Sequence, residues 1–526
     1  MKINLPSLNS TGRNELVVLL LCLLIGFTLR YCTFDQKSLW LDEIYTYGEA
    51  KLGLKDQLKF YEEKPYYLHP PLFFILTHFL YPFTKPERDL RLLPLIFGTL
   101  SVPMIYFLSR LFSHRIALPC TLSLIFMAYH ISLSQEGRSY SMLMFFGMVG
   151  LYFILKHLLT LKRRYLLPAA LSFAILFHTS YSSIPFILFS QGLWFYQTGH
   201  SDRKHRFTSF LIMNGLLLLM CLPWILFLAS HYRGQPIMGH RLRPDLGSFW
   251  SIYYGILNDW SPHAPLMITS VILVILFPIF SKYHRNAILL LALLLIPIGG
   301  IYLYCELFNI THFITSRYFI NFLPLFFITL YLSINAIEDR FERLRRVMRV
   351  RLLFVLLFIV SNLFILIPYY FSEKQDLRGL VTYLKSNIQD GDKILVGTDL
   401  YIPGMLHYFG IYPEGKLYLL PTRKISDKEF ETQISLMLQG KIFTIYYSNS
   451  WTQCFNEGRR LWMVVNKTAA EKIKRDSSTA NLDVKYIKTF DGSFLNFNRF
   501  PTDASMYLFL WDPSTPKEKG INLPFE

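Results

Sequence analysis

The amino-acid sequence predicts an α-helical polytopic membrane protein with about eleven transmembrane helices and a C-terminal soluble α/β domain. Of the 526 residues, 52% are hydrophobic and 17% are aromatic. The apolar residues form long blocks, and several blocks approach or exceed the roughly 18 residues that mark a membrane-spanning helix. After Tyr370 the composition changes, and no later segment is apolar enough to span a membrane.

The distribution of basic residues favours a membrane protein over a nucleic-acid-binding protein. The formal net charge is +17, and Lys and Arg gather in short loops between apolar blocks. This is the positive-inside pattern, which reports topology and not a polyanion-binding surface. We therefore expect the lipid bilayer, and no nucleic acid, as a partner.

Cysteine spacing predicts neither a metal cluster nor a disulfide framework. No pair has the C-x-x-C spacing that either would favour. The six cysteines are Cys22, Cys32, Cys120, Cys221, Cys305 and Cys454.

The first apolar block, residues 15–32, is predicted to be a retained transmembrane helix. No small-residue cleavage site follows it, which distinguishes it from a secretory signal peptide.

The basic loops fix the orientation of the helices that follow. Five such loops occupy residues 110–115, 156–164, 203–206, 282–285 and 338–351. With Arg13 inside, all five face the cytoplasm only if residues 69–83 do not span. That segment of about 15 residues is therefore interpreted as a helix lying in the outer interface.

With all five basic loops on the cytoplasmic side, the sequence predicts eleven spans and two domains. The spans are predicted at 15–32, 92–110, 116–134, 139–158, 166–180, 182–197, 207–229, 265–281, 286–305, 317–337 and 352–371. The transmembrane domain thus covers residues 1–371, with a long outward first loop at 33–91. Residues 372–526 form a soluble domain on the outer, periplasmic side.

Residues 372–526 alternate a helical stretch with short strand-like ones, which indicates a small α/β domain. The helical pattern covers residues 376–388. The strand-like segments are 393–398, 416–421, 441–448, 460–465 and 505–511.

Polar side chains gather on the outward side of the predicted membrane. Ionisable groups at a membrane edge are costly to bury and are functional candidates. They are Asp42, Glu43, Glu63, Lys64 and His69 in the first loop, Gln135, Glu136 and Arg138 in the second, His178 and Tyr181 at the next outward turn, and Arg317 and Tyr318 beside the tenth span.

Adjacent acids on a helix point in different directions. Asp42 and Glu43 would be rotated by roughly 100° from each other, so one would face a reaction centre while the other holds a neighbouring group. The alternative is that both are solvated charges at the start of an interfacial helix. Arg138 and Arg317 suit a phosphate, because the guanidinium fork matches its oxygens and stays charged. A carboxylate with two arginines indicates a reaction in which a phosphate leaves an amphiphilic donor.

Four ordered motifs, SLWLDEIYT, LHPPLFFILTHFL, LRLLPLIFGTLSVPMIYFLSRLF and ISLSQEGRSYSMLMFF, resemble the amino-terminal half of bacterial C-type membrane glycosyltransferases. The resemblance is to the family of protein O-mannosyltransferases, lipid A aminoarabinose transferases and core-sugar transferases of rhizobial lipopolysaccharide. The later SRYFINFLPLF and DLRGLVTYLKSNIQDGDKILV also fit. The resemblance implies a C-type fold in a bacterial inner membrane.

The resemblance also implies an inverting transfer of a sugar from a polyprenyl phosphate to a cell-envelope acceptor. Asp42 would be the catalytic carboxylate and Glu43 its support, while Glu136 aligns with a second-loop acid that some relatives use. The HPP that begins at His69 stands where aminoarabinose transferases carry Lys-Pro, and Lys64 is the candidate substitute.

Arg138, Arg317 and Tyr318 complete the predicted donor-phosphate site. His69 is either a ligand in this site or a helix cap. No cofactor is specified, and a divalent metal held by Asp42, Glu136 and His69 is left open.

Two other functions are weighed against this one. A transporter or flippase of lipid-linked glycans would show discontinuous helices, inverted repeats and charges near the bilayer midplane. A polymer ligase would carry its large functional loop late in the chain. The sequence identifies neither the sugar nor the acceptor.

Overall fold

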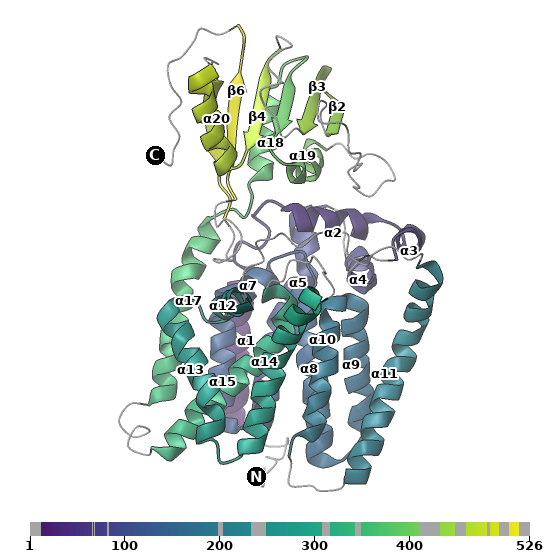
Figure 1. Cartoon of the computed structure of the whole chain (residues 1–526), viewed down its shortest axis with the longest axis vertical. Helices are drawn as coiled ribbons and strands as arrows, with labels where there is room; N and C mark the ends of the chain where they lie inside the picture. The colour runs from purple at the N-terminus through teal and green to yellow at the C-terminus, as the bar shows by residue number, and fades with distance from the viewer. Residues whose placement is uncertain are drawn as a thin grey trace. The chain divides into compact units, whose positions relative to one another are not determined.

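The computed structural model describes residues 12–65, 67, 69–80, 84–197, 203–232, 249–307, 316–341, 349–410, 432–447, 459–480, 484–493 and 504–514 (Figure 1). Its contacts divide the chain into two compact units. The helical unit contains Met1–Phe34 and Leu52–Ile367, and the sheet unit contains Asp35–Lys51 and Pro368–Glu526. The sheet unit is therefore built from two separate stretches of chain.

Long apolar helices form the helical unit. Seven described helices are long and apolar enough to cross a membrane, and two bent helix pairs raise the number to nine if each pair is one span. The seven are α1 (Arg13–Tyr31), α5 (Pro86–Phe112), α8 (Tyr140–Thr160), α11 (Arg203–His231), α14 (His284–Leu307), α15 (Leu323–Arg340) with the preceding η5 (Ser316–Phe322), and α17 (Val350–Phe371). The bent pairs are α6 (His114–Phe126) with α7 (Ala128–Ser134), at 62°, and α12 (Phe249–Trp260) with α13 (Ala264–Phe280), at 102°.

The predicted count of eleven spans is not confirmed. The predicted spans 166–180 and 182–197 correspond to α9 (Leu166–Thr179) and to α10 (Ile184–Ser190) continued by η4 (Gln191–Phe195). Each is shorter than the roughly 18 residues that mark a span. α9 has 14 residues, and the 3-10 turn η3 (Tyr181–Ser183) separates it from α10. Both nevertheless lie within the bundle, where α9 packs against α8 and α11.

The segment predicted at 69–83 to lie in the interface contains one short helix, α4 (Leu72–Leu80). Its nine residues reach about 14 Å, which is less than half of a hydrocarbon core of roughly 30 Å. Residues 81–83 lie outside the described part of the chain.

The basic segments of the helical unit lie at one end of the bundle. Arg110 and His114 bind Glu15 at 3.0 and 2.9 Å, Arg115 binds Asp339 at 2.8 Å, and Arg351 binds Glu338 at 3.1 Å. At the same end, the His205 ring meets the Leu161 carbonyl at 3.1 Å, and Arg206 donates to the Tyr196 carbonyl at 3.1 Å. We call this end the basic end. The gathering of these basic side chains at one end agrees with the prediction that the basic loops share one side of the membrane.

The bend between α6 and α7 is held by side chains from remote segments. In a straight helix the N–H groups of Ala128 and the next residue would bind the carbonyls of Leu124 and Ile125. Instead, the fully buried Arg30 donates to the Leu124 carbonyl at 2.9 Å and to the Ile125 carbonyl at 3.4 Å. The Ala128 N–H donates to Oδ1 of Asn362 at 3.0 Å. The backbone groups freed by the bend are thus satisfied inside the bundle, as an apolar surrounding requires.

The sheet unit contains a six-stranded mixed sheet in the order β2-β3-β1-β4-β6-β5. The strands are β1 (Lys393–Val396), β2 (Thr432–Leu438), β3 (Lys441–Tyr447), β4 (Leu461–Val465), β5 (Val484–Phe490) and β6 (Met506–Trp511). β1 is parallel to β3 and β4, and the other pairs are antiparallel. The predicted α/β domain is confirmed, although the predicted strand at 416–421 lies outside the described residues.

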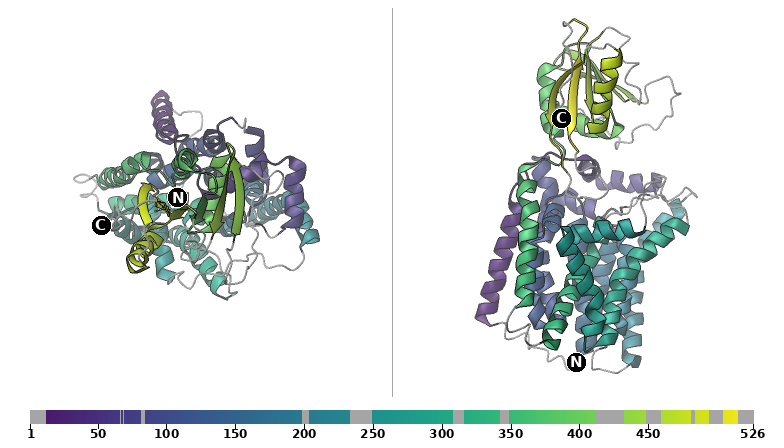
Figure 2. Two further views of the ribbon diagram at one scale, coloured as in Figure 1. Left: turned by 90° about the horizontal axis from the view of Figure 1, so that it is seen from above. Right: turned by 60° about the vertical axis from the view of Figure 1, so that its left-hand side comes forward.

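Helices cover both faces of this sheet, as Figure 2 shows. On one face, Leu461 and Met463 pack with Ala470 and Ile473 of α20 (Lys467–Ala480). On the other face, the Trp462 ring contacts Tyr383 of α18 (Leu377–Asn387) at 6.3 Å between centroids. This alternation along β4 explains why all five of its residues are buried.

Replacing Arg30 tests the support of the bend. Arg30→Met should lower the free energy of unfolding by about 1–3 kcal/mol, because buried carbonyls lose their donors. The measurement is the midpoint of SDS-induced unfolding, followed by far-UV circular dichroism. Leu20→Ala, at a residue that is 55% exposed on the same helix, should leave the midpoint unchanged. An Arg30→Met protein as stable as the wild type would contradict this account of the bend.

Candidate active site

His69 joins three segments of the helical unit at the end opposite the basic end. Its Nε2 lies 3.0 Å from Nη2 of Arg138, in the second predicted outward loop. Its Nδ1 lies 3.5 Å from Oγ of Ser180, in the turn after α9. The Tyr61 hydroxyl donates to the His69 carbonyl at 2.7 Å, which fixes the backbone as well as the ring. Residues remote in sequence therefore converge on this histidine.

The contact with Arg138 determines the tautomer of His69. A guanidinium can only donate, so Nε2 of His69 must accept. The ring proton then lies on Nδ1, from where it can point at Ser180. The ring consequently orients Arg138 without competing with it for an anion.

Local chain chemistry places His69 at this position. α3 (Leu54–Glu63) is capped by Lys64, and Pro70 and Pro71 stand between it and α4. Proline has no N–H and suits the start of a helix, which explains why α4 begins immediately afterwards. Lys64 lies at the C-terminal end of α3, with Nζ 5.2 Å from the centre of the Phe60 ring.

Tight contacts hold the second loop between α7 and α8. Nε2 of Gln135 donates to the Arg30 carbonyl at 2.9 Å and also to the Cys32 carbonyl, and so closes the C-terminal end of α1. The Arg138 N–H donates to the carbonyl of the buried Glu136 at 2.6 Å. This turn projects the Arg138 side chain towards His69.

Arg317 lies beside the start of α8. Its guanidinium carbon is 5.7 Å from the centre of the Tyr140 ring and 5.9 Å from that of Tyr318. Because Tyr140 begins α8 and follows Arg138 by two residues, both predicted arginines lie near the start of this helix. Aromatic faces favour a cation without neutralising it.

A buried carboxylate that the sequence did not single out supports the segment of Arg317. Oγ of Ser316 donates in a short hydrogen bond to Asp259, and the Tyr129 hydroxyl donates to Ser316 at 2.8 Å. All three side chains are buried. In the sequence, Asp259 is recognisable only as an acid shortly before an apolar block. Its role depends on the contact between α12 and η5, which are remote in sequence.

His178 and Tyr181 have structural contacts. His178 Nε2 lies 3.2 Å from the Met220 carbonyl, and the Trp224 indole donates to the Tyr181 hydroxyl at 2.7 Å. Both therefore tie the turn after α9 to α11.

Asp42 and Glu43 belong to the sheet unit, on α2 (Leu41–Lys51). Glu43 is 1% exposed, and its Oε2 accepts from the Trp40 N–H at 3.4 Å. A glutamate three residues into a helix commonly closes the first turn in this way. Asp42 is half-buried, and its carbonyl accepts from the Thr46 hydroxyl at 3.0 Å. The Glu43 side chain is therefore more deeply buried than that of Asp42.

The segment before α2 is tied to the chain around α18 and α19 (Ile402–Phe409). Ser38 N–H donates to Glu373 at 3.0 Å, and Leu39 N–H donates to the Tyr408 hydroxyl at 2.7 Å. Nζ of Lys374 lies 3.7 Å from the centre of the Trp40 ring. Burial raises the pKa of Glu373, which already accepts the Ser38 bond. These contacts fix α2 within the sheet unit.

The predicted residues therefore fall into two sets. Lys64, His69, Glu136, Arg138, Arg317 and Tyr318 lie in the helical unit, whereas Asp42 and Glu43 lie in the sheet unit. Within the described residues, no group of three or more His, Cys, Asp or Glu side chains is arranged to hold a metal ion.

Known families and structures that are similar to this chain belong to the same kind of protein as the motifs indicate. Residues 66–233 match the family model described as dolichyl-phosphate-mannose-protein mannosyltransferase. No curated protein matches the chain.

Two solved structures share the fold. The crystal structure of ArnT from Cupriavidus metallidurans in the apo state has 11% identity and a TM-score of 0.53, covering 96% of this chain and 99% of that chain. The structure of the same protein bound to undecaprenyl phosphate has 11% identity and a TM-score of 0.51, covering 95% and 98%. The family match and the shared fold confirm the resemblance predicted from the motifs, and the two structures show a likeness of fold.

A double-mutant cycle tests the contact between His69 and Arg138. The two alanine substitutions should couple by about 1 kcal/mol in the free energy of unfolding, because either one alone removes the same hydrogen bond. SDS unfolding of the two single variants and the double variant gives the coupling. The matched cycle of His69→Ala with Arg115→Ala, at the basic end, should be additive. Additivity in both cycles would show that the 3.0 Å contact contributes nothing.

Proposed function

We propose that the protein is an inverting glycosyltransferase that moves a hexose or pentose from a polyprenyl phosphate to a cell-envelope acceptor on the periplasmic face. The match of residues 66–233 to the mannosyltransferase family supports the reaction class. The likeness of fold to ArnT, which was crystallised with undecaprenyl phosphate, supports the donor class. The acceptor would be a lipid, a glycan or a protein of the envelope.

The observation that carries the proposal is the grouping of Arg138 and Arg317 about the start of α8. Both lie at the end of the helical unit opposite the basic end, where His69 contacts Arg138 and aromatic rings contact Arg317. Two permanent cations in such surroundings suit a phosphate that gains charge as it leaves. Tyr318, beside Arg317, would contact the same phosphate, and Lys64 would supply a further cation.

The reaction would proceed by direct displacement. The Asp42 carboxylate takes the proton of the acceptor hydroxyl or amine, while the acceptor atom attacks the anomeric carbon. The bond from that carbon to the phosphate oxygen breaks, and its electron pair leaves with the polyprenyl phosphate. Attack from the face opposite the phosphate inverts the anomeric configuration.

The other acids would have supporting roles. Glu43 fixes the first turn of α2 through the Trp40 N–H, and thereby sets the direction of Asp42. Glu136 lies in the turn that carries Arg138 and would shape the acceptor side of the site.

A flippase of lipid-linked glycans is the second candidate, because the two bent helix pairs are a feature that transporters also have. Sugar transfer in detergent solution separates the two functions, since detergent leaves no membrane sides for a flippase to connect. Transfer from a polyprenyl-phosphate sugar to an envelope extract supports the transferase. Absence of transfer, combined with donor movement across proteoliposomes, would establish the flippase. Mass spectrometry of envelope glycolipids and glycoproteins with and without the protein would identify the acceptor.

Asp42→Asn tests the base. This change keeps the size of the side chain but removes its basicity, so turnover should fall by about 100-fold or more while donor binding is retained. Glu43→Gln should cost less, because its effect is on position. Asp56→Asn, an exposed acid in the first turn of α3, is the control and should keep full turnover. Normal transfer by purified Asp42→Asn protein would assign both acids to the interface.

Arg317→Ala tests the phosphate site. Loss of a guanidinium at the donor phosphate should raise the donor KM by about tenfold or more and leave the acceptor KM nearly unchanged. Steady-state kinetics against each substrate gives the two values. Arg285→Ala removes an exposed arginine at the basic end and should change neither. An unchanged donor KM in folded Arg317→Ala protein would return this arginine to a structural role.

Reporter fusions test the orientation. A reporter that is active only outside the cytoplasm should work when fused after residue 400, because the sheet unit is proposed to be periplasmic. The same reporter fused near Arg206, at the basic end, should be silent. Equal behaviour of the two fusions would refute the topology and the proposed location of the reaction.

A further inference from the structure

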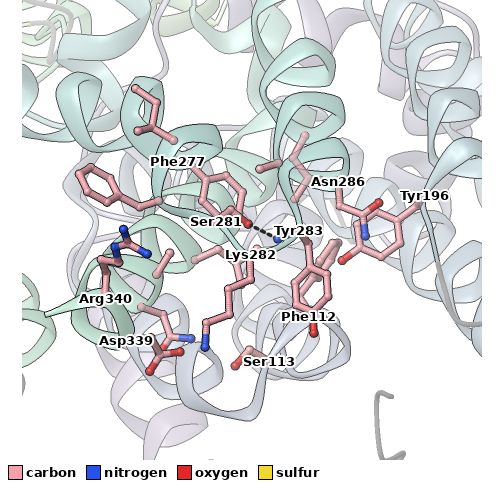
Figure 3. A pocket seen from close by; sticks show the side chains of 17 residues that line it. Phe112, Ser113, Tyr196, Phe277, Ser281, Lys282, Tyr283, Asn286, Asp339 and Arg340 are labelled. Carbon is pink, nitrogen blue, oxygen red and sulfur yellow. Dashed lines mark hydrogen bonds between the residues drawn. The ribbon is translucent and has the colours of Figure 1, made fainter. Parts of the chain in front are cut away.

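A cavity of about 660 Å³ opens at the basic end of the helical unit (Figure 3). It lies between the turn joining α5 to α6, the end of η4, the turn joining α13 to α14, and the last turns of α15. In the view of Figure 3, Lys282, Asp339 and Arg340 line one side, and Tyr196 and Asn286 line the other. Each helix lines the cavity with the end that lies farther from Arg138 and Arg317.

The inner wall of the cavity is apolar. Phe112, Phe277, Ala287 and Leu290 line it and are buried. At the mouth, Ile279 is 70% exposed. It ends a row of exposed isoleucines on α13, formed by Ile268, Ile272, Ile275 and Ile279. Helical spacing puts these on one face, which in a membrane protein contacts lipid. The cavity therefore opens beside a lipid-facing surface.

The rim of the cavity carries unbalanced positive charge. Lys282 and Arg340 are exposed, and no carboxylate among the described residues forms an ion pair with either. The acid on the rim, Asp339, is bound by Arg115 at 2.8 Å. An anion at this rim would thus meet two cations and a carboxylate that is already neutralised.

Asn335, which lines the cavity, carries a buried acceptor without a described donor. Oδ1 of Asn335 is buried and has no hydrogen-bond partner among the residues that the structure describes. Asn335 is one of the residues that line the cavity. A buried acceptor without a partner is costly, so a hydroxyl group at this place would be stabilised. The amide of Asn286 differs, because it exchanges bonds of 2.9 and 3.0 Å with the backbone of Gln197.

We propose that this cavity binds an anionic glycerophospholipid whose head group bears a hydroxyl, from the leaflet that faces the basic end. The phosphate lies between Lys282 and Arg340, the head-group hydroxyl donates to Asn335, and the acyl chains follow the apolar wall to Ile279. Cavities of this size hold head groups and small ligands, and basic pockets between helices on the cytoplasmic side bind anionic lipids. The apolar wall and the adjoining lipid-facing row select a lipid over a free phosphate. The site goes beyond the proposed function and is separate from Arg138 and Arg317.

Lipid binding to the purified full chain tests the site. Native mass spectrometry in a neutral detergent would compare dioleoylphosphatidylglycerol with dioleoylphosphatidylcholine. The double variant Lys282→Gln, Arg340→Gln should bind phosphatidylglycerol about 10- to 30-fold more weakly. Arg203→Gln, Lys204→Gln removes the same charge from exposed positions at the same end, and its affinity should change less than about twofold. Equal weakening in both double variants, or none in either, would overturn the proposal.

Two further comparisons identify the chemistry of the ligand. Asn335→Leu should weaken phosphatidylglycerol binding but leave dioleoylphosphatidylmethanol, which has no head-group hydroxyl, unaffected. Equal weakening of both lipids would refute the role of Asn335. Glycerol 1-phosphate should not displace the lipid at equal concentration. Displacement would show a site for soluble anions and would overturn the assignment to a lipid.

Discussion

The helical unit depends on the hydrogen bonds that Arg30 and Asn362 make to the backbone groups left unpaired at the bend between α6 and α7. Within an apolar bundle a helix can bend only where its freed N–H and C=O groups find partners. Arg30 reaches the carbonyls of α6, and it also contacts Nδ1 of His130 at 2.8 Å. The bend directs α7 towards the loop of residues 135–138, and Gln135 returns from that loop to the end of α1. One guanidinium thereby links the membrane core to the position of Arg138.

The two ends of the helical unit use positive charge differently. At the basic end, Glu15, Glu338 and Asp339 bind arginine and histidine side chains from other segments. The exposed pairs contribute little stability individually, whereas the carboxylate of Glu338 is buried. All of these pairs locate the helix ends relative to each other. At the opposite end, the contacts of Arg138 and Arg317 include an imidazole and aromatic rings. Such neighbours fix the position of a cation.

Patterns local in sequence predicted much of this molecule, and contacts between remote segments account for what was missed. Apolar length located the long helices, but it does not distinguish α9 and α10 from full spans, because a short helix inside a bundle can be as apolar as a span. Strands β1, β3, β4 and β6 carry dense apolar runs and were predicted. β2 and β5 were not predicted, and β5, with the sequence VKYIKTF, mixes lysines into its strand.

In the candidate site, too, local motifs indicated single residues, while contacts between remote segments were missed. The motifs indicated His69, Arg138 and Arg317, whereas the contact of His69 with Ser180 joins residues 111 positions apart. The support of Ser316 by Asp259 is equally remote from any local pattern. The grouping of residues 35–51 with the sheet unit likewise depends on partners late in the chain.

That grouping has a consequence for biosynthesis. The bond from Ser38 to Glu373 joins residues 335 positions apart, so the first residues of the sheet unit leave the ribosome long before their partners exist. At roughly 5–20 residues per second the interval is about 20 to 70 s. Throughout it the helix that carries Asp42 lacks the partners that fix it. A prematurely terminated chain can therefore insert most of its helices and still fail to assemble the proposed base, which makes completion of translation a condition for activity.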